Sequence, residues 1–417
     1  MPFSIALSGL NAASSDLEVT GNNIANSSTN GFKSSRTEFS DVFAVSTGGV
    51  SATAIGSGVR LANVAQEFGQ GNIDFTSSTL DLAINGEGFF VLSDGGSQIY
   101  SRAGAYSIDR NGYVVNSAGQ RLQVFDPIGT SGDTFNTGSL SDLQVSQTEG
   151  APQATSDIGV NMNLDSGDPV ITAPFDPNDA TTFNFSTSFS VFDSQGVEHS
   201  ATVYFQKQAS NDWDARLYLD GTDPGDVVQV GGADTFNFTF DDAGQLVPGS
   251  GDLTGTEVVF DAKNPGNGAA DLNFTMDLAE VVQYGGGFTV NSLSQDGFAK
   301  GKLSGLSISD EGVISARFTN GQSNALGKVA LASFPNPGEL RQVGNTNWAE
   351  TFSSGQPLVG EPGTGSLGAI QSGALESSNV DIAAELIKLI TAQRNFQANS
   401  QVISTADTIT QTIINIR

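Results

Sequence analysis

The segment Asn22-Asn-Ile-Ala-Asn-Ser-Ser-Thr-Asn-Gly-Phe-Lys33 closes a regular apolar pattern that begins at residue 3. Its side chains are mostly small and polar, and its Asn30-Gly31 pair has the chemistry of a turn. In the residues before it, large apolar side chains recur every seven positions with smaller ones between them: Phe3, Leu10, Leu17 and Ile24, with Ala6, Ala13 and Thr20. This heptad spacing predicts an apolar helix that ends at the Asn-rich segment.

A second helical pattern occupies residues 380–417, at the other end of the chain. One apolar set is spaced by seven: Ile382, Leu389, Phe396 and Ile403. Another follows alternating steps of four and three: Val402, Ala406, Ile409, Ile413 and Ile416. Because the two sets are out of phase by about one residue, the apolar face is expected to drift around the helix near Gln401. The candidate N-cap residues are Ser377, Ser378 and Asn379.

The two terminal helices are expected to pair and then to pack against copies of themselves. Their other faces are rich in Ser, Asn, Thr and Gln and poor in charge, whereas a solvated helix normally displays charged side chains. A two-helix hairpin alone also buries too little apolar area to be stable. The alternative is an ordinary bundle within one molecule. The predicted self-assembly interface consists of Phe3, Leu10, Leu17, Ile24, Ile382, Leu389, Phe396, Ile403, Ile409, Ile413 and Ile416.

The chain between the helices has the pattern of β structure. Short apolar runs alternate with the turn pairs Asn85-Gly86, Asp94-Gly95, Asn111-Gly112 and Glu311-Gly312. The last two share one strand–turn–strand pattern although they lie far apart in the sequence. We therefore expect residues 79–150 and 290–354 to form one discontinuous β domain, with 31–78 and 355–375 as an extended linker region.

Residues 151–289 form a separate, acidic insertion. Apolar side chains at strand spacing predict β structure there: Phe183, Phe185, Phe189 and Val191, then Phe236, Phe238 and Phe240. Of the chain's net charge of −28, most falls in this insertion, which has Lys207, Arg216 and Lys263 as its only basic residues. Such charge favours an outward, solvated domain.

Together these patterns predict an α+β multidomain fold. Its terminal helices, 1–30 and 376–417, pair as a coiled-coil inner layer, and two mainly antiparallel β domains are inserted between them.

Composition excludes several classes of function. The chain of 417 residues has no Cys, which rules out disulfides, thiolate zinc sites and a Cys nucleophile. Its negative charge disfavours binding to nucleic acid or anionic lipid, and no apolar run is long enough to insert into a membrane. Residues 1–10 lack the positive region and cleavage site of a secretory signal, so we expect the protein either to stay inside or to leave uncleaved.

Neither catalysis nor a bound cofactor is expected. The only histidine, His199, lies in a probable strand, where a lone His is far more often structural than catalytic. A Pro-rich loop carries four carboxylates that suit a hard cation such as Ca²⁺: Asp165, Asp168, Asp176 and Asp179. Their spacing fits no calcium-loop motif, however, and acidic loops are usually only solvated. The sequence therefore predicts no metal site.

Four motifs resemble those of bacterial flagellar rod and hook proteins, an axial protein family. The N-terminal ones are Leu7-Ser-Gly-Leu-Asn-Ala-Ala and the Asn22–Lys33 segment. The C-terminal ones are Leu375-Glu-Ser-Ser-Asn-Val-Asp-Ile-Ala-Ala-Glu-Leu and Ile390-Thr-Ala-Gln-Arg-Asn-Phe-Gln-Ala-Asn. Leu82-Ala-Ile-Asn-Gly-Glu-Gly-Phe-Phe-Val-Leu and Asn345-Thr-Asn-Trp between them are also similar to the family. An insertion of this size resembles the hook members rather than the shorter distal rod members.

The resemblance implies a subunit of a curved, flexible tube outside the cell that couples rod to filament, transmits torque and encloses an export channel. It implies as partners other copies of the chain, a distal rod protein, a hook cap protein, a hook–filament junction protein and the flagellar type III export apparatus, through which the chain leaves without cleavage. The alternatives are a distal rod-type axial protein and a non-flagellar, oligomeric adhesin-like β protein.

Overall fold

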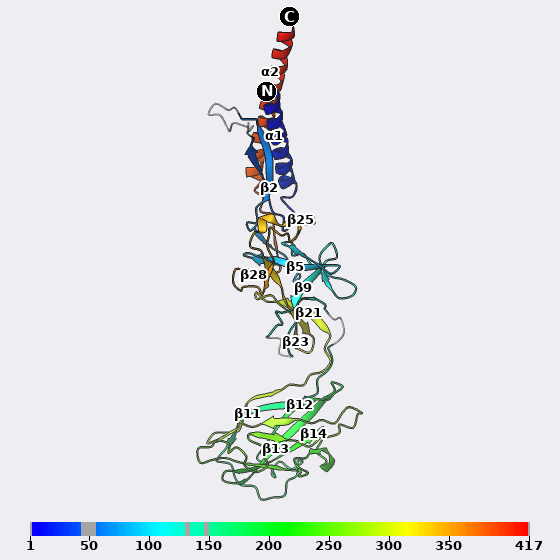
Figure 1. Cartoon of the computed structure of the whole chain (residues 1–417). Coiled ribbons are helices and arrows are strands. Elements are labelled where there is room, and N and C mark those ends of the chain that lie inside the picture. The colour runs from blue at the N-terminus through cyan, green and yellow to red at the C-terminus, as the bar shows by residue number, and fades with distance from the viewer. Residues whose placement is uncertain (1, 43–55, 130–133, 146–149, 416–417) are drawn as a thin grey trace. The chain divides into compact units, whose positions relative to one another are not determined.

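The structure is a computed structural model that describes residues 2–42, 56–129, 134–145 and 150–415. The chain divides into two compact units. Unit 1 comprises Met1–Gln147, Gly305–Arg317 and Ser323–Arg417, and unit 2 comprises Thr148–Ser304 and Phe318–Gln322. The fold is mostly β, with one long helix at each end of the chain (Figure 1). None of the helices in the described ranges is both long and apolar enough to cross a membrane.

The two terminal helices, α1 (Pro2–Ala25) and α2 (Ile382–Asn415), pack side by side in unit 1 (Figure 1). They run antiparallel, because Asn23 near the end of α1 meets Glu385 near the start of α2, and Gly9 meets Asn399 further along. At ~1.5 Å per residue the helices are about 36 and 51 Å long, so α2 extends past the start of α1.

The chain leaves α1 through turns at residues 26–31. Gly31 has φ +69°, and a Cβ there would lie 2.5 Å from the Ala103 nitrogen, so only glycine fits. The chain then forms an antiparallel hairpin of β1 (Ser35–Asp41) and β2 (Val59–Gln66). The hairpin lies along α1, where the Thr37 hydroxyl donates to Asp16 at 2.6 Å. The region predicted to be extended therefore contains a hairpin, because a helix is available to pack against it.

The main sheet of unit 1 draws strands from both sides of the insertion. Within the described residues it has thirteen strands, with the central order β21-β22-β23-β9-β5-β6-β26-β25. The bounds are β5 (Phe89–Asp94), β6 (Ser97–Ser101), β7 (Ser107–Ile108), β8 (Val114–Val115), β9 (Arg121–Phe125), β10 (Ser141–Asp142), β21 (Leu303–Ile308), β22 (Val313–Phe318), β23 (Ser323–Val329), β24 (Leu331–Ser333), β25 (Arg341–Gly344), β26 (Asn347–Ala349) and β27 (Leu358–Gly360). A short 3-10 helix, η2 (Pro337–Glu339), precedes β25. Aromatic residues centred on Phe89, Tyr100 and Trp348 fill its core.

Two short strand pairs connect this sheet to the base of the helices. β3 (Ile73–Phe75) pairs with β29 (Ala374–Glu376), and β4 (Leu82–Asn85) pairs with β28 (Ala369–Ser372). The hairpins predicted at Asp94-Gly95, Asn111-Gly112 and Glu311-Gly312 are present. The prediction of a hairpin at Asn85-Gly86 is wrong. There the chain passes between strands with different partners, since β4 pairs with β28 and β5 with β6.

Unit 2 packs two five-stranded sheets around one core. The first contains β11 (Asp157–Asp165), β17 (Glu257–Val259), β18 (Thr275–Asp277), β19 (Val282–Tyr284) and β20 (Thr289–Gln295). The second contains β12 (Phe185–Phe192), β13 (Glu198–Ala209), β14 (Asp212–Leu219), β15 (Val227–Val228) and β16 (Phe236–Thr239), with the 3-10 helix η1 (Pro224–Asp226) before β15. β11 pairs in parallel with β18 and β19, so the unit is not purely antiparallel.

Strict alternation explains how these strands make a core. Along β11 every second residue from Ile158 to Leu164 is buried, as expected for a strand with one inward face. Phe236, Phe238 and Phe240, predicted from the same spacing, are all buried, and Trp213 is fully enclosed beside them. The sheet that contains β11 also includes β20 (Thr289–Gln295), so it extends past residue 289, where the predicted insertion ended.

Candidate self-assembly site

The two terminal helices meet through small side chains. Ala6 and Ala13 on α1 and Ala392 on α2 are almost fully buried, whereas their larger neighbours are not. A Cβ on Gly9 would lie 2.6 Å from the Asn399 Oδ1, so the helices approach closely at that position. Interhelical distance follows the size of the side chains at the contact. The centre of the helix pair is therefore a seam of small residues.

The predicted interface residues fall into three groups around this seam. Six are half-buried and alternate with the seam residues in heptad order: Leu10, Leu17, Ile24, Leu389, Phe396 and Ile403. Three are about half exposed: Phe3, Ile382 and Ile409. The side chain of Ile413 and the whole of Ile416 lie outside the described residues. The structure thus half-buries the first six and leaves the next three on the surface.

Several exposed apolar residues on the same helices were not predicted from the sequence. Ile382 is followed at helical spacing by Leu386 and Ile390, and all three are 47–50% exposed. This row of three is called the α2 apolar row below. Four-residue spacing from Ile382 was the signal that could have found it, but the seven-residue repeat concealed it. At the other end of α2, Phe3 and Val402 line an apolar groove with Ile409.

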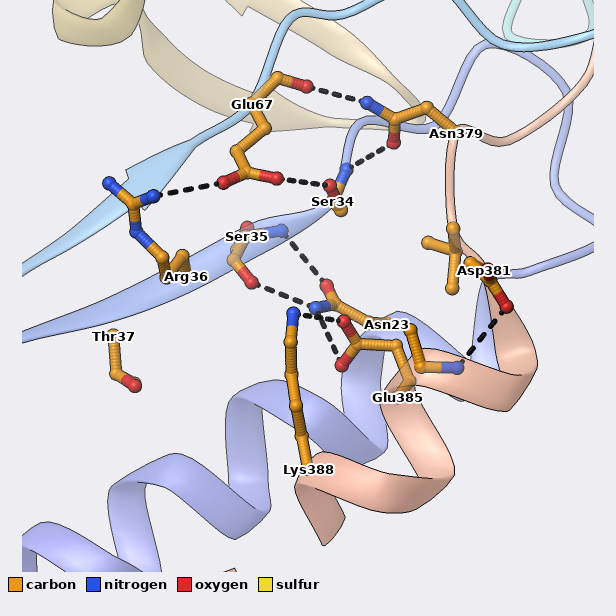
Figure 2. A network of polar contacts seen from close by, with 12 residues as sticks. Asn23, Ser34, Ser35, Arg36, Thr37, Glu67, Asn379, Asp381, Glu385 and Lys388 are labelled. Carbon is orange, nitrogen blue, oxygen red and sulfur yellow. Dashed lines mark hydrogen bonds and ion pairs between the residues drawn. The ribbon is translucent and has the colours of Figure 1, made fainter.

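Where α1 ends and α2 begins, the Asn23 side chain bonds to the backbone of β1 (Figure 2). The Asn23 side chain accepts a hydrogen bond from the Ser35 nitrogen at 2.9 Å and donates to the Ser35 oxygen at 2.8 Å. The same amide lies 3.4 Å from the Glu385 carboxylate, which Lys388 also contacts at 2.7 Å. Asn23 therefore joins α1, β1 and α2 at one point.

Asn379 performs a similar role on the other side of the junction (Figure 2). Its Oδ1 accepts from the Ser34 nitrogen at 2.8 Å, and its Nδ2 donates to the Glu67 carbonyl at 2.7 Å. Because Asn379 is used in this way, it does not cap α2. The N-cap is Asp381, whose carboxylate accepts from the nitrogens of Ala383 and Ala384, so the prediction of a cap at Ser377, Ser378 or Asn379 is wrong.

A buried ion cluster ties the two terminal motifs together. Glu376 Oε1 lies 2.6 Å from Lys33 Nζ, and its Oε2 lies 3.1 Å from Arg102 Nη1. The side chains of Lys33 and Glu376 have no solvent exposure. Lys33 also donates to the Gly69 carbonyl, and the Gly71 nitrogen donates to Glu376. Burial lowers the pKa of Lys33 and of Arg102, while the Glu376 charge opposes that shift.

The groups considered for catalysis or metal binding lie in unit 2. His199 is buried between Asp193 and Asp220. In the acidic loop, the Lys207 ammonium donates to the carbonyls of Ser166 and Asp168, which places a cation among the loop's backbone oxygens. Among the described residues, no three His or acidic side chains are grouped so that they could hold a metal ion.

Sequence models of flagellar protein families match the chain in four segments. The flagella basal body rod protein model matches residues 3–33, and the FlgE/F/G hook protein D1 domain model matches residues 83–164. The FlaE D2 domain model matches residues 163–298, and the FlgEFG rod protein C-terminal model matches residues 371–416. The first and last of these segments contain α1 and α2.

Curated relatives match from end to end. Flagellar hook protein FlgE of Escherichia coli K12 is 37% identical over 422 residues, covering 100% of both chains. FlgE of Borreliella burgdorferi is 32% identical over 445 residues, covering 99% of this chain and 98% of that protein. The crystal structure of Helicobacter pylori flagellar hook protein FlgE2 shares the fold, with a TM-score of 0.54 at 16% identity, over 73% of this chain and 100% of that one. With relatives of this identity along its whole length, the chain belongs to the flagellar hook protein family.

Proposed function

We propose that this chain is a structural subunit, not an enzyme, that polymerises through α1 and α2 into the tube of the flagellar hook. The observation that carries the proposal is the α2 apolar row, which a single copy leaves half exposed. Covering large apolar side chains on one helix face with a partner is favourable, by about 25 cal/mol per Å² of apolar surface removed from water. A second copy of the chain is the partner that a homopolymer supplies.

The inner layer of such a tube would consist of the helix pairs, arranged as a coiled coil. Between its apolar residues, the exposed surface of α2 is rich in Thr, Ser, Asn and Gln. A polar, weakly charged wall of this kind would offer an exported chain little electrostatic attraction. The β units, with mainly antiparallel strands, would lie outside it and shift against their neighbours as the tube bends and transmits torque.

The specific partners proposed are those of a hook subunit. They are other copies of the chain, a distal rod protein, a hook cap protein, a hook–filament junction protein and the type III export apparatus. The location would be outside the cell, after export without cleavage. The domain assignment proposed from sequence follows the same scheme, with the helices inside, the discontinuous β domain next and the acidic insertion outermost.

The test separates assembly from pairing within one molecule. Leu386→Asp with Ile390→Asp places charge on side chains that are exposed in the single copy, so we expect the monomer to remain folded and polymerisation to be lost. Leu10→Asp with Leu17→Asp should also abolish polymerisation. Val259→Asp, at an equally exposed valine on β17, is the matched control and should polymerise normally.

Electron microscopy of purified protein gives the readout. Long curved tubes from wild type and Val259→Asp, with none from the helix variants, would support the proposal. Normal tubes from the Leu386→Asp, Ile390→Asp protein would refute the assigned interface. Discrete particles from the wild type would instead favour an adhesin-like oligomer.

A further inference from the structure

The only histidine of the chain lies between two carboxylates in unit 2. His199 is on β13 and is 5% exposed. Its Nδ1 lies 2.5 Å from Asp220 Oδ2, and its Nε2 lies 3.2 Å from Asp193 Oδ2. Both ring nitrogens therefore face an oxygen of an acidic side chain.

This geometry specifies the protonation state of the ring. A neutral imidazole has one N–H donor and one nitrogen that only accepts, whereas an ionised carboxylate only accepts. Two ionised carboxylates can both be satisfied only by an imidazolium, which donates from both nitrogens. The site is therefore built for a positively charged histidine.

Each carboxylate is itself held by the backbone. Asp193 Oδ1 accepts from the nitrogens of Gln195 and Val197, and its Oδ2 also accepts from the Asn267 side chain. Asp220 Oδ1 accepts from the Ser200 nitrogen at 2.8 Å. Asp220 also adopts φ +61°, a conformation that costs free energy for a residue other than glycine. The ion cluster thus joins the β12–β13 turn, the end of β14 and the loop around Asn267.

The two neighbouring carboxylates favour the charged form of the ring. Burial alone would lower the pKa of His199, but the bonds and charges of Asp220 and Asp193 outweigh it and raise that pKa. Burial would raise the pKa of Asp193, but its hydrogen bonds lower it to about 2. The ionisable groups that act on His199 from the adjoining segments are these two aspartates, and Asn267 is neutral.

We propose that the His199 imidazolium holds these three segments of unit 2 together through its two ionic contacts, and that a rise in pH weakens these contacts by removing its proton. A neutral ring leaves either the buried Asp193 carboxylate or the half-exposed Asp220 carboxylate facing an acceptor nitrogen, so that contact becomes repulsive. Either Asp220, with its strained backbone, or Asp193, to which Asn267 donates, then loses its histidine partner. The proposal concerns unit 2 alone and does not depend on polymerisation.

The direction of the pH effect follows from the raised pKa. A group whose pKa is higher in the folded state stabilises the fold fully below its unfolded pKa, about 6.5 for histidine. That contribution is lost as the pH rises through the folded value. We therefore expect unit 2 to loosen as the pH rises through the folded pKa of His199, whereas well below pH 6.5 the stabilisation by the histidine is complete and no longer changes with pH.

Nitrogen-15 NMR of the unassembled full-length chain is a direct test, because one histidine gives one pair of ring signals. We expect both ring nitrogens to be protonated at pH 6 and the titration midpoint to lie above the free-histidine value. Amide exchange at Gln195, Val197 and Ser200, whose nitrogens donate to the two aspartates, should accelerate as the pH passes that midpoint. Both Asp193→Asn and Asp220→Asn should lower the midpoint.

Asp241→Asn is the matched control. Asp241 accepts from the nitrogens two and four residues ahead, as Asp193 does, but it has no histidine partner. It should leave the midpoint unchanged. The proposal would be overturned by a neutral ring tautomer at pH 6 or by a titration midpoint that neither Asp193→Asn nor Asp220→Asn changes. It would also be overturned if the amide exchange rates did not change as the histidine titrates.

Discussion

Glu376 is the single carboxylate that receives both Lys33 and Arg102 at the base of the helix pair. All three side chains are almost fully buried, so water cannot replace a lost partner. Taking ions out of water is costly, and the cluster is favourable only while it is complete. One carboxylate therefore links a residue near the N-terminal helix, Lys33, and Arg102 to the segment that precedes α2.

The substitution Glu376→Gln should therefore destabilise unit 1 strongly. Removing one partner of a buried ion pair costs about 3–5 kcal/mol, because the remaining charges stay buried and uncompensated. Glu38→Gln is the control, since its partner Arg36 and Glu38 itself are 58% and 43% exposed. Surface pairs of that kind contribute about 0–1 kcal/mol. Urea unfolding of the two variants measures the difference, and equal losses would contradict the importance given to burial.

At the scale of secondary-structure elements, one turn is used repeatedly to connect strands. Its first residue is Asp109, Asn116, Asp193, Asp241 or Ser309, and in each case a glycine follows three residues later. The first four side chains accept from the nitrogens two and four residues ahead, and Ser309 accepts from the nitrogen four ahead. The five glycines have φ of 76–83°, which glycine adopts without strain. This local chemistry made the hairpins at Asn111-Gly112 and Glu311-Gly312 predictable from sequence.

The register of α1 against α2 is the feature of the helix pair most open to test. Gly9 and Asn399 face each other closely enough for a disulfide, whose Cβ atoms lie about 3.5–4.5 Å apart. The chain has no cysteine, so an engineered pair has no competitors. Gly9→Cys with Asn399→Cys should form a crosslink within one molecule under mild oxidation, visible as a faster-migrating monomer on a non-reducing gel.

The control for this crosslink uses the same α2 position with a different α1 position. Gly21 has no atom beyond its immediate surroundings within 4 Å of an added Cβ, and it lies about 18 Å along the helix from Gly9. Gly21→Cys with Asn399→Cys should therefore leave the monomer uncrosslinked. Efficient crosslinking of this control pair, or none of the Gly9 pair, would show that the helices pair in another register.

At the scale of the whole molecule, each of the two compact units has a hydrophobic core of its own. Unit 2 has a large core around Trp213, and unit 1 has an aromatic core around Trp348. A core that buries its own apolar surface can unfold on its own. We therefore expect calorimetry of the unassembled chain to resolve two unfolding transitions.

Variants assign each transition to a unit. Trp213→Ala should lower the free energy of unfolding of unit 2 alone, by about 3–5 kcal/mol. Trp213 is fully buried, and its indole nitrogen donates to the Gln283 side chain at 2.9 Å. Glu376→Gln should lower only the transition of unit 1. A single transition, or a shift of both by either variant, would mean that the units unfold as one.

Much of the fold was predictable because its signals are local. The terminal helices follow from heptad spacing, the core strands of unit 2 from alternate phenylalanines, and several hairpins from their turn residues. The hairpin predicted at Asn85-Gly86 failed because a turn pair cannot specify the partner of the following strand. The β1–β2 hairpin within the predicted linker was missed because its strands, four of whose residues are charged, become ordered against α1.

The candidate site was only partly predictable. Seven-residue spacing found the half-buried residues beside the seam, but it did not show that alanines occupy the centre and leave Leu386 and Ile390 outside. Which apolar residues are covered depends on where the second helix lies, and that position is fixed by contacts such as Asn23 with Glu385.

By itself, the sequence determined the helical ends, the β character of the middle and the acidic insertion, because periodicity, turn chemistry and charge act over a few neighbouring residues. Only the tertiary structure decided that Lys33, Arg102 and Glu376 meet in one dry cluster, and that His199 lies between Asp193 and Asp220. These contacts join residues that are distant in the chain or lie on different strands. Their energy depends on burial and on distances of about 3 Å, which spacing along the chain does not encode.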